Sequence, residues 1–155
     1  MKIIEREAFG NKQGFTLVEL LVVISIIGFL TVASVVAFNM VRMQSRDAIR
    51  VANIATINRA LAMYLNDSFT GYPTSTGECL SGDSGVGAEL KAAEMIIKVS
   101  TDPLWEAEEP NPDIYGDTDG FCYHYASNNK DEYQLSYYLE SNSKSGDAGA
   151  HIFVP

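Results

Sequence analysis

The sequence predicts an α+β fold, in which a long N-terminal helix packs on a small C-terminal antiparallel sheet. Two observations lead to this prediction. The apolar run from Leu20 to Phe38 has no charge and no proline, and neither glycine nor proline occurs between Gly28 and Gly71. Further along, two stretches of alternating apolar and polar residues flank a turn-like sequence, which is typical of a hairpin. Helix and sheet are therefore expected in separate parts of the chain.

The helix is expected from about Phe15 to Asp67. Its first half is long enough to cross a hydrocarbon core of about 30 Å. Beyond Asn39 the pattern becomes amphipathic, with apolar residues at spacings of three and four: Val51, Ile54, Ile57, Leu61, Tyr64 and Leu65. The turn-forming stretch from Asn66 to Pro73 ends the helix. One half of the helix is thus suited to lipid, and the other half needs a small domain to cover its apolar stripe.

That domain is expected from residues 71–155. The segment Tyr72–Gly87 is predicted as a loop, and Ala88–Val99 as a short helix with Val86, Leu90, Ala93 and Ile97 on one side. The alternating stretches Phe121–Tyr125 and Tyr133–Leu139 predict a hairpin, with a third strand near Ile114-Tyr115 or at His151–Val154. A two-stranded ribbon alone would be marginal, so we expect the sheet to pack on the outer half of the helix.

The charge is distributed unevenly along the chain. The net charge is −9, and from residue 61 onward 16 acidic residues stand against four lysines. Such an acidic domain would repel phosphates, so we do not expect direct nucleic acid binding. Arg42, Arg46 and Arg50 recur at spacings of four and share one helix face. We expect this face to be solvated, or to lie at lipid headgroups or at acidic surfaces of neighbouring copies.

The two cysteines, Cys79 and Cys122, exclude a CxxC redox motif and a four-cysteine zinc site. An even pair in an exported domain predicts one disulfide. Two buried free thiols in a reducing compartment are the alternative.

The segment Gly14 to Gly28, GFTLVELLVVISIIG, places one carboxylate, Glu19, at the start of the apolar run. A charge within a membrane segment is costly and needs a partner, unless it only marks the membrane edge. The segment resembles the processing and assembly motif of type IV prepilins and type II secretion pseudopilins. In that family a short charged leader ends in glycine, and a membrane-embedded peptidase cuts after it and N-methylates the new terminus.

The resemblance implies specific roles for residues of this chain. Gly14 would be the last leader residue, Phe15 the methylated N-terminus, and Glu19 the acid that neutralises the new amine in the same or a neighbouring subunit. The helix-on-helix filament core would include Phe15, Leu17, Val18, Leu20, Leu21, Val22 and Val23. The implied domains are a leader at 1–14, a transmembrane half at 15–38, an amphipathic half at 39–70 and a globular ectodomain at 71–155.

The outer domain is also similar to the tail of major pseudopilins, through Asp102-Pro103-Leu104-Trp105 followed by the tyrosine-rich strands. Several of those domains bind calcium. Here Asp113, Asp117 and Asp119, with Gly120 following, form an acidic loop of suitable oxygen ligands, although the spacing departs from an EF-hand. A solvated acidic loop is the alternative. The resemblance requires no cofactor.

The implied partners are identical and related pilin subunits in a helical polymer, the prepilin peptidase, the membrane, and an inner-membrane assembly platform with a separate ATPase. The chain would first sit in the cytoplasmic membrane with its C-terminal domain outside, and then enter a periplasmic or extracellular filament. In two respects the chain gives less support. Val36 stands where many family members have a proline, and the positive charges flanking the apolar run are tied at three on each side.

Two other functions compete with this interpretation. A membrane-anchored extracytoplasmic binding domain that never polymerises, with the acidic loop binding calcium, would retain residues 1–14. Secretion after a conventional signal peptide cut near Ala37 fits less well, because the apolar run is too long. We do not expect an enzyme: the nearest candidate pair is Cys122 and His124, which is better explained as a disulfide cysteine beside a histidine on an edge strand.

Overall fold

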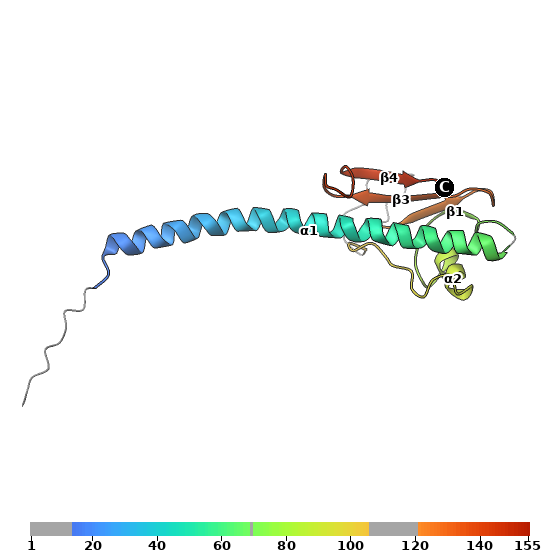
Figure 1. The fold of residues 1–155 in the computed structure, drawn as a ribbon, viewed down its shortest axis with the longest axis horizontal. Coiled ribbons are helices and arrows are strands. Elements are labelled where there is room, and N and C mark those ends of the chain that lie inside the picture. Colours follow the sequence, from blue (N-terminus) through green and yellow to red (C-terminus); the bar gives the residue numbers. More distant parts are fainter. Residues whose placement is uncertain (1–13, 69, 106–120) are drawn as a thin grey trace, which may run out of the picture. The chain divides into compact units, whose positions relative to one another are not determined.

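The computed structural model describes residues 14–68, 70–105 and 121–155, and it has the predicted α+β fold (Figure 1). Its elements are α1 (Leu17–Ser68), β1 (Ser75–Cys79), α2 (Gly85–Ala92), β2 (His124–Ser127), β3 (Gln134–Leu139) and β4 (Gly149–Phe153). The chain divides into two compact units, Met1–Asn39 and Met40–Pro155. We call them the apolar unit and the globular unit and describe each by itself.

In the apolar unit, the helix satisfies its own polar side chains. The hydroxyl of Ser25 donates to the carbonyl of Val22 at 2.7 Å. The Thr31 and Ser34 hydroxyls donate in the same way to carbonyls four residues earlier, at 2.7 and 2.8 Å. Hydroxyls bonded within the helix need no water, so these residues can lie in an apolar environment at little cost.

The globular unit contains a four-stranded antiparallel sheet in the order β1-β2-β3-β4. The predicted hairpin is confirmed as β2 and β3, which pair with Tyr125 opposite Leu135. The third strand is confirmed in its C-terminal position as β4, which pairs with β3 from Leu135–Phe153 to Leu139–Gly149. The alternative position, Ile114-Tyr115, lies outside the described residues.

The prediction of a loop over Tyr72–Gly87 is wrong, because Ser75–Cys79 forms β1 and pairs with β2. Its Gly, Ser and Thr content favours a loop locally, but pairing with an existing strand outweighs this preference. The register shifts between Ser75 and Glu78, and Gly77 between them has a φ of 139°, a conformation that glycine adopts without strain. Strand β2 consequently lies inside the sheet, so His124 is not on an edge strand.

Helix α2 begins and ends earlier than the predicted range Ala88–Val99. Val86 and Leu90 are buried as predicted, but Ile97 is 99% exposed. The helix ends because Glu94 has a positive φ of 60°, and the amide of Met95 donates back to the carbonyl of Leu90 at 3.0 Å. At the other end, the Glu78 carboxylate accepts a 2.6 Å hydrogen bond from the Val86 amide and so satisfies one free N–H group of the first turn.

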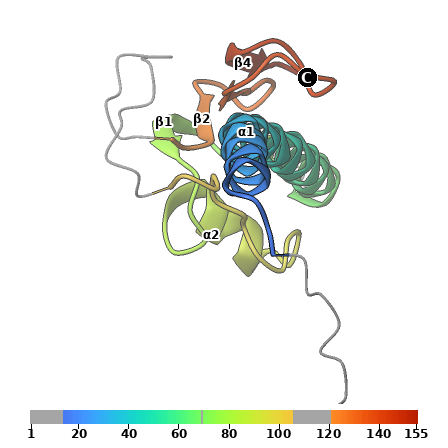
Figure 2. The same cartoon turned by 90° about the vertical axis from the view of Figure 1, so that its left-hand side faces the viewer.

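The core of the globular unit forms between the outer part of α1 and the sheet. Ile54, Ile57 and Leu61 of α1 are buried against a cluster that includes Tyr123, Tyr125 and Leu135. The amide of Asn53 donates to the Tyr123 hydroxyl at 2.9 Å. Burial raises the pKa of Tyr123 to about 12, so this hydroxyl stays protonated. In two views at right angles, α2 and β4 lie on opposite sides of α1 (Figures 1 and 2).

Candidate assembly site

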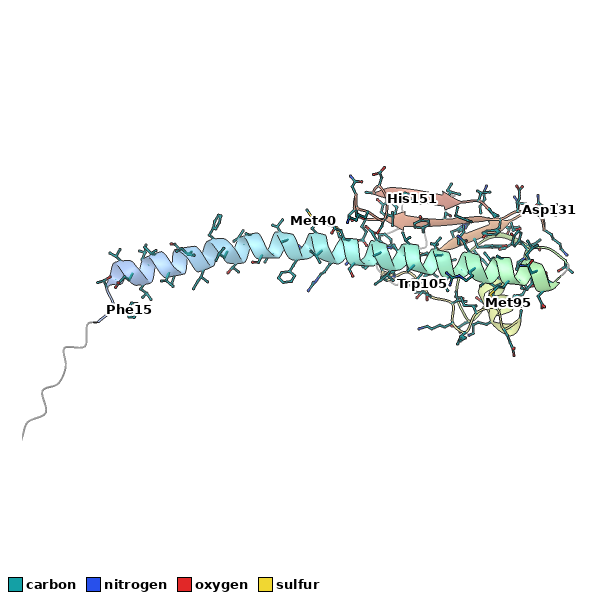
Figure 3. All side chains as sticks on the ribbon, viewed as in Figure 1. Phe15, Met40, Met95, Trp105, Asp131 and His151 are labelled. Carbon is teal, nitrogen blue, oxygen red and sulfur yellow. A yellow bond between two sulfur atoms is a disulfide. The ribbon has the colours of Figure 1, made fainter. Side chains whose placement is uncertain are left out.

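The N-terminal end of the described chain holds the predicted processing residues. Gly14 and Phe15 precede α1 outside any regular element, and both are exposed (Figure 3). Phe15 has 89% of its surface exposed. An exposed backbone segment outside regular structure is the kind of site that proteases cleave.

Thr16 and Glu19 form a reciprocal cap at the start of α1. The Glu19 carboxylate accepts hydrogen bonds from the Thr16 amide at 2.8 Å and from the Thr16 hydroxyl at 2.7 Å. In return, the Glu19 amide donates to the Thr16 hydroxyl at 3.2 Å. This is a capping box, in which Thr and Glu three residues apart satisfy helix amides that have no partner within the helix.

Thr16 is thus a site residue that our sequence analysis missed. The signal was present, because a threonine followed three residues later by glutamate, just before an apolar run, is the sequence pattern of a capping box. The cap also gives Glu19 a partner within its own chain. Both of the bonds that Glu19 accepts from Thr16 use the Oε2 oxygen.

The side chains predicted for the filament core are all exposed. Every residue from 14 to 41 is exposed. Leu17, Val18, Leu20 and Leu21 have between 55% and 79% of their surface exposed. Helix α1 is long and apolar enough to cross a membrane by length and composition. A contiguous apolar surface of this extent requires lipid or other protein surfaces to cover it.

The predicted disulfide between Cys79 and Cys122 is present. The two cysteines are 43 residues apart in sequence, and their Cα atoms lie 5.5 Å apart. The bond joins the end of β1 to the residue two before β2. It therefore holds β1, the strand that the sequence did not predict, beside β2.

The arginine face of α1 differs from its prediction at Arg50, which is fully buried. Its guanidinium donates to Asp102 Oδ2 and Oδ1 at 2.7 and 3.0 Å, to Asp47 Oδ1 at 2.9 Å and to Glu140 Oε1 at 2.5 Å. The Phe121 ring lies 5.1 Å from the guanidinium carbon. Arg46 also donates to Glu140, at 2.7 Å from Nε, while Arg42 is exposed as predicted.

We call Arg46, Asp47, Arg50, Asp102 and Glu140 the ionic cluster. Asp47 also accepts from the backbone amides of Glu140 and Ser141, each at 2.9 Å. Burial alone would raise the pKa of Asp47, but these hydrogen bonds and those from the Ser141 hydroxyl and Arg50 hold it below its usual range. Glu140 behaves in the same way, because the bonds from Arg46 and Arg50 outweigh its burial and lower its pKa. Arg50, whose pKa the carboxylates raise, stays charged.

The proposed calcium ligands Asp113, Asp117 and Asp119 lie outside the described residues, so calcium binding stays a prediction. Within residues 14–68, 70–105 and 121–155, no three His, Cys, Asp or Glu residues are grouped to hold a metal ion.

The described chain combines a helix that is long and apolar enough to cross a membrane with a small disulfide-bonded α+β unit, features that suggest a membrane-anchored protein. Residues 10–35 match the family model described as the prokaryotic N-terminal methylation motif. These residues carry the prepilin-type signature, which supports a pilin- or pseudopilin-like protein. Comparisons with curated proteins and with solved structures yield no match.

Proposed function

We propose that this chain is a structural subunit of a type IV pilus-like or type II secretion-like filament, processed by prepilin peptidase and polymerised through α1. The observation that carries the proposal is the methylation motif at the start of a helix whose first half is apolar and exposed on every side. A helix apolar all round belongs in lipid or in the core of a bundle. A filament subunit needs both environments in turn.

The proposal divides the chain into four functional parts. Residues 1–14 would be the leader, 15–38 the apolar segment that moves from membrane to filament core, 39–70 the amphipathic half of the helix, and 71–155 the domain on the filament surface. The partners would be other pilin subunits, the peptidase and an assembly platform in the cytoplasmic membrane. The work of assembly would come from a separate ATPase.

Glu19 has a defined role in this proposal. Cleavage after Gly14 leaves a positive amine on Phe15, which must be paired if it is to enter lipid or a filament core. Thr16 already occupies Oε2 of Glu19, so Oε1 is the oxygen that would accept the amine of the same or a neighbouring chain. The cap would hold the carboxylate in place before the partner arrives.

The first test is the mass of the N-terminal peptide from the native membrane or filament fraction. We expect a peptide that begins at N-methylated Phe15. A peptide that still contains residues 1–14, from cells with an active prepilin peptidase, would contradict processing and favour a permanently anchored binding domain. As a second measurement, Glu19→Ala should leave processing intact but lose filaments, and normal filaments from Glu19→Ala would refute its role in assembly.

A further inference from the structure

Two exposed apolar surfaces of the globular unit carry opposite charges. The first, the groove surface, is made by the outer part of α1 and the segment after α2. The second, the strand surface, is made by the end of β4 and the turn before β3. Both combine large exposed apolar side chains with a hollow, and the charged side chains that line the hollow are basic in the first surface and acidic in the second.

The groove surface surrounds a shallow hollow of about 400 Å³. Its lining residues are Thr56, Arg59, Ala60, Met63, Met95, Ile96, Ile97 and Lys98. Ile97 is 99% exposed and Met63 is 48% exposed. The charged side chains in this lining, Arg59 and Lys98, are both basic and exposed.

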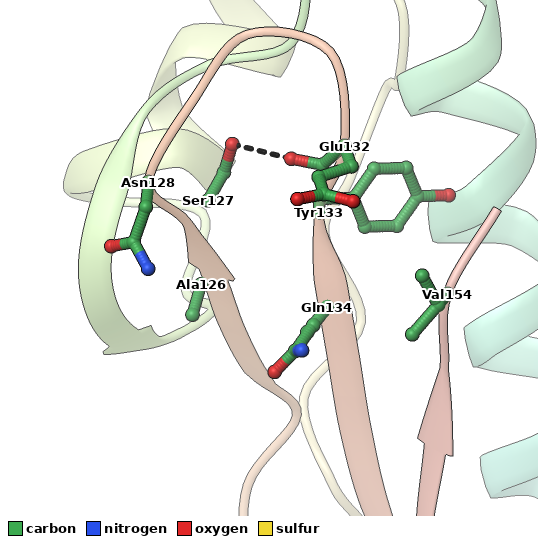
Figure 4. Close-up of a pocket in the computed structure, with 7 residues that line it drawn as sticks. All are labelled: Ala126, Ser127, Asn128, Glu132, Tyr133, Gln134 and Val154. Atoms are coloured by element: carbon green, nitrogen blue, oxygen red, sulfur yellow. Dashed lines mark hydrogen bonds between the residues drawn. The ribbon is translucent and has the colours of Figure 1, made fainter.

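The strand surface carries Val154, which directly follows β4 and is 50% exposed. Val154 also lines a hollow of about 120 Å³ together with Ala126, Ser127, Asn128, Glu132, Tyr133 and Gln134 (Figure 4). A cavity of about 150 Å³ accepts a benzene ring, so this hollow suits one aliphatic side chain. The charged residue in its lining is Glu132, and the exposed residues before it in the turn are Lys130 and Asp131.

The two surfaces lie on opposite sides of α1. Met95, in the groove surface, and His151, on β4, are separated by the helix (Figure 3). The end-on view likewise places α2 and β4 on opposite sides (Figure 2). A single chain therefore cannot join its own two surfaces, but one copy can present its groove surface to the strand surface of another.

We propose that the groove surface of one copy binds the strand surface of a second copy, with Ile97 seated beside Val154 and Lys98 paired with Glu132. The occupant is a second copy because this chain itself supplies the matching features. On the groove surface, exposed Ile97 stands beside basic Lys98. On the strand surface, Val154 lines a small hollow that also contains acidic Glu132. Such a contact joins two different surfaces, so every pair of copies still has one free groove surface and one free strand surface. Further copies can therefore add at both ends, and the array stays open unless the rotation between neighbouring copies closes it into a ring.

This inference rests on the proposed function, because the contact alone is small. A few apolar side chains and one or two ion pairs fall below the area of about 1,000 Å² that a stable interface needs. Subunits already held together through α1 would raise the effective concentration of the two surfaces and make a weak contact effective. The contact would then fix the lateral arrangement of globular units.

The test is cross-linking of the full-length protein in cells, scored in the membrane fraction and in sheared filaments. The variant combines Ile97→Cys with Val154→Cys, because a disulfide forms only where the Cβ atoms approach to about 4 Å. The native cysteines are already bonded to each other. With a mild oxidant we expect a ladder of dimers, trimers and longer species. The matched control combines Ile97→Cys with Lys144→Cys, an exposed position beyond the opposite end of β3, and should give no ladder.

Charge exchange gives a second readout. Lys98→Glu should reduce the ladder at least several-fold, and adding Glu132→Lys should restore it, whereas Lys144→Glu should leave it unchanged.

Intact filaments with no ladder would overturn this inference and leave the proposed function standing. A ladder in membranes that form no filaments would support the contact and overturn the proposed function. An adduct to a different protein, a dimer that never extends, or the absence of both filaments and ladder would overturn the contact between copies.

Discussion

Replacing Arg50 with methionine should destabilise the globular unit more than any other single change to an arginine of α1. Methionine has a similar length and is a good helix former, so the helix itself is little affected. The substitution removes four hydrogen bonds to the carboxylates of Asp47, Asp102 and Glu140. It leaves those carboxylates with only one of the cluster's two positive charges, that of Arg46.

The magnitude follows from burial. Asp47 is fully buried and Asp102 is 4% exposed, so neither carboxylate can recover its hydration when Arg50 is lost. Removing one member of a buried ion pair costs about 3–5 kcal/mol because an uncompensated charge stays in the interior. Arg46 is more exposed and donates to Glu140 alone, so Arg46→Met should cost about 1 kcal/mol or less. The difference between two arginines one turn apart is the measurable quantity.

The assay is urea unfolding of the full-length protein in detergent micelles, followed by fluorescence. Trp105 is the single tryptophan of the chain and lies three residues after Asp102, so its emission reports on the neighbourhood of the ionic cluster. Arg46→Met is the matched control, since it removes the same charge from the same helix face. Equal costs for the two variants, or a loss below about 1 kcal/mol for Arg50→Met, would refute the view that Arg50 is the central cation of the cluster.

Two further predictions concern the globular unit. Replacing both Cys79 and Cys122 with serine should lower the free energy of unfolding by about 4 kcal/mol, because the disulfide closes a loop of 43 residues. Calorimetry of the oxidised protein and of the variant measures this difference, and unchanged stability would contradict the prediction. Asp47 and Glu140 have lower pKa values in the folded state than in the unfolded chain. Their contribution to stability is therefore complete above their pKa values in the unfolded chain, about 3.9 and 4.3, and is lost as the pH falls through their pKa values in the folded state. Urea unfolding curves measured between pH 6 and about pH 3 should show this loss of stability, and Asp47→Asn should make the free energy of unfolding depend less steeply on pH. The same pH dependence in the variant and the wild type would contradict this role of Asp47.

The parts of the fold that the sequence predicts are those governed by local pattern. Helix α1 is predicted from Phe15 to Asp67 and extends from Leu17 to Ser68, because a long segment without proline, and with Gly28 as its one glycine, favours a continuous helix. The hairpin of β2 and β3 and the cysteine pair also follow from local signals. At the proposed site, the motif around Gly14, Phe15 and Glu19 is contiguous in sequence, so it was visible without a structure.

The features that escaped prediction depend on distant partners. Strand β1 has a loop-like composition and forms because β2 and the disulfide lie beside it. Arg50 looks like its neighbours Arg42 and Arg46 in sequence, yet two of its three carboxylate partners come from positions 52 and 90 residues away, which no local pattern reveals. The exposure of Ile97 likewise depends on a positive φ at Glu94, and glutamate gives no sign of that conformation.

Asp47 gives the ionic cluster a selectivity that repeated arginines alone would not have. Because Arg42, Arg46 and Arg50 recur every four residues, a slip of α1 by one turn would bring Arg46 into the place of Arg50. The same slip would move Asp47 away from the amides of Glu140 and Ser141, which it binds through both carboxylate oxygens. The two backbone amides have fixed positions, so both can donate to Asp47 in only one register of α1 against the end of β3. Buried ionic groups of this kind can specify one arrangement even where they add little stability, and here that arrangement is the register of α1 against β3.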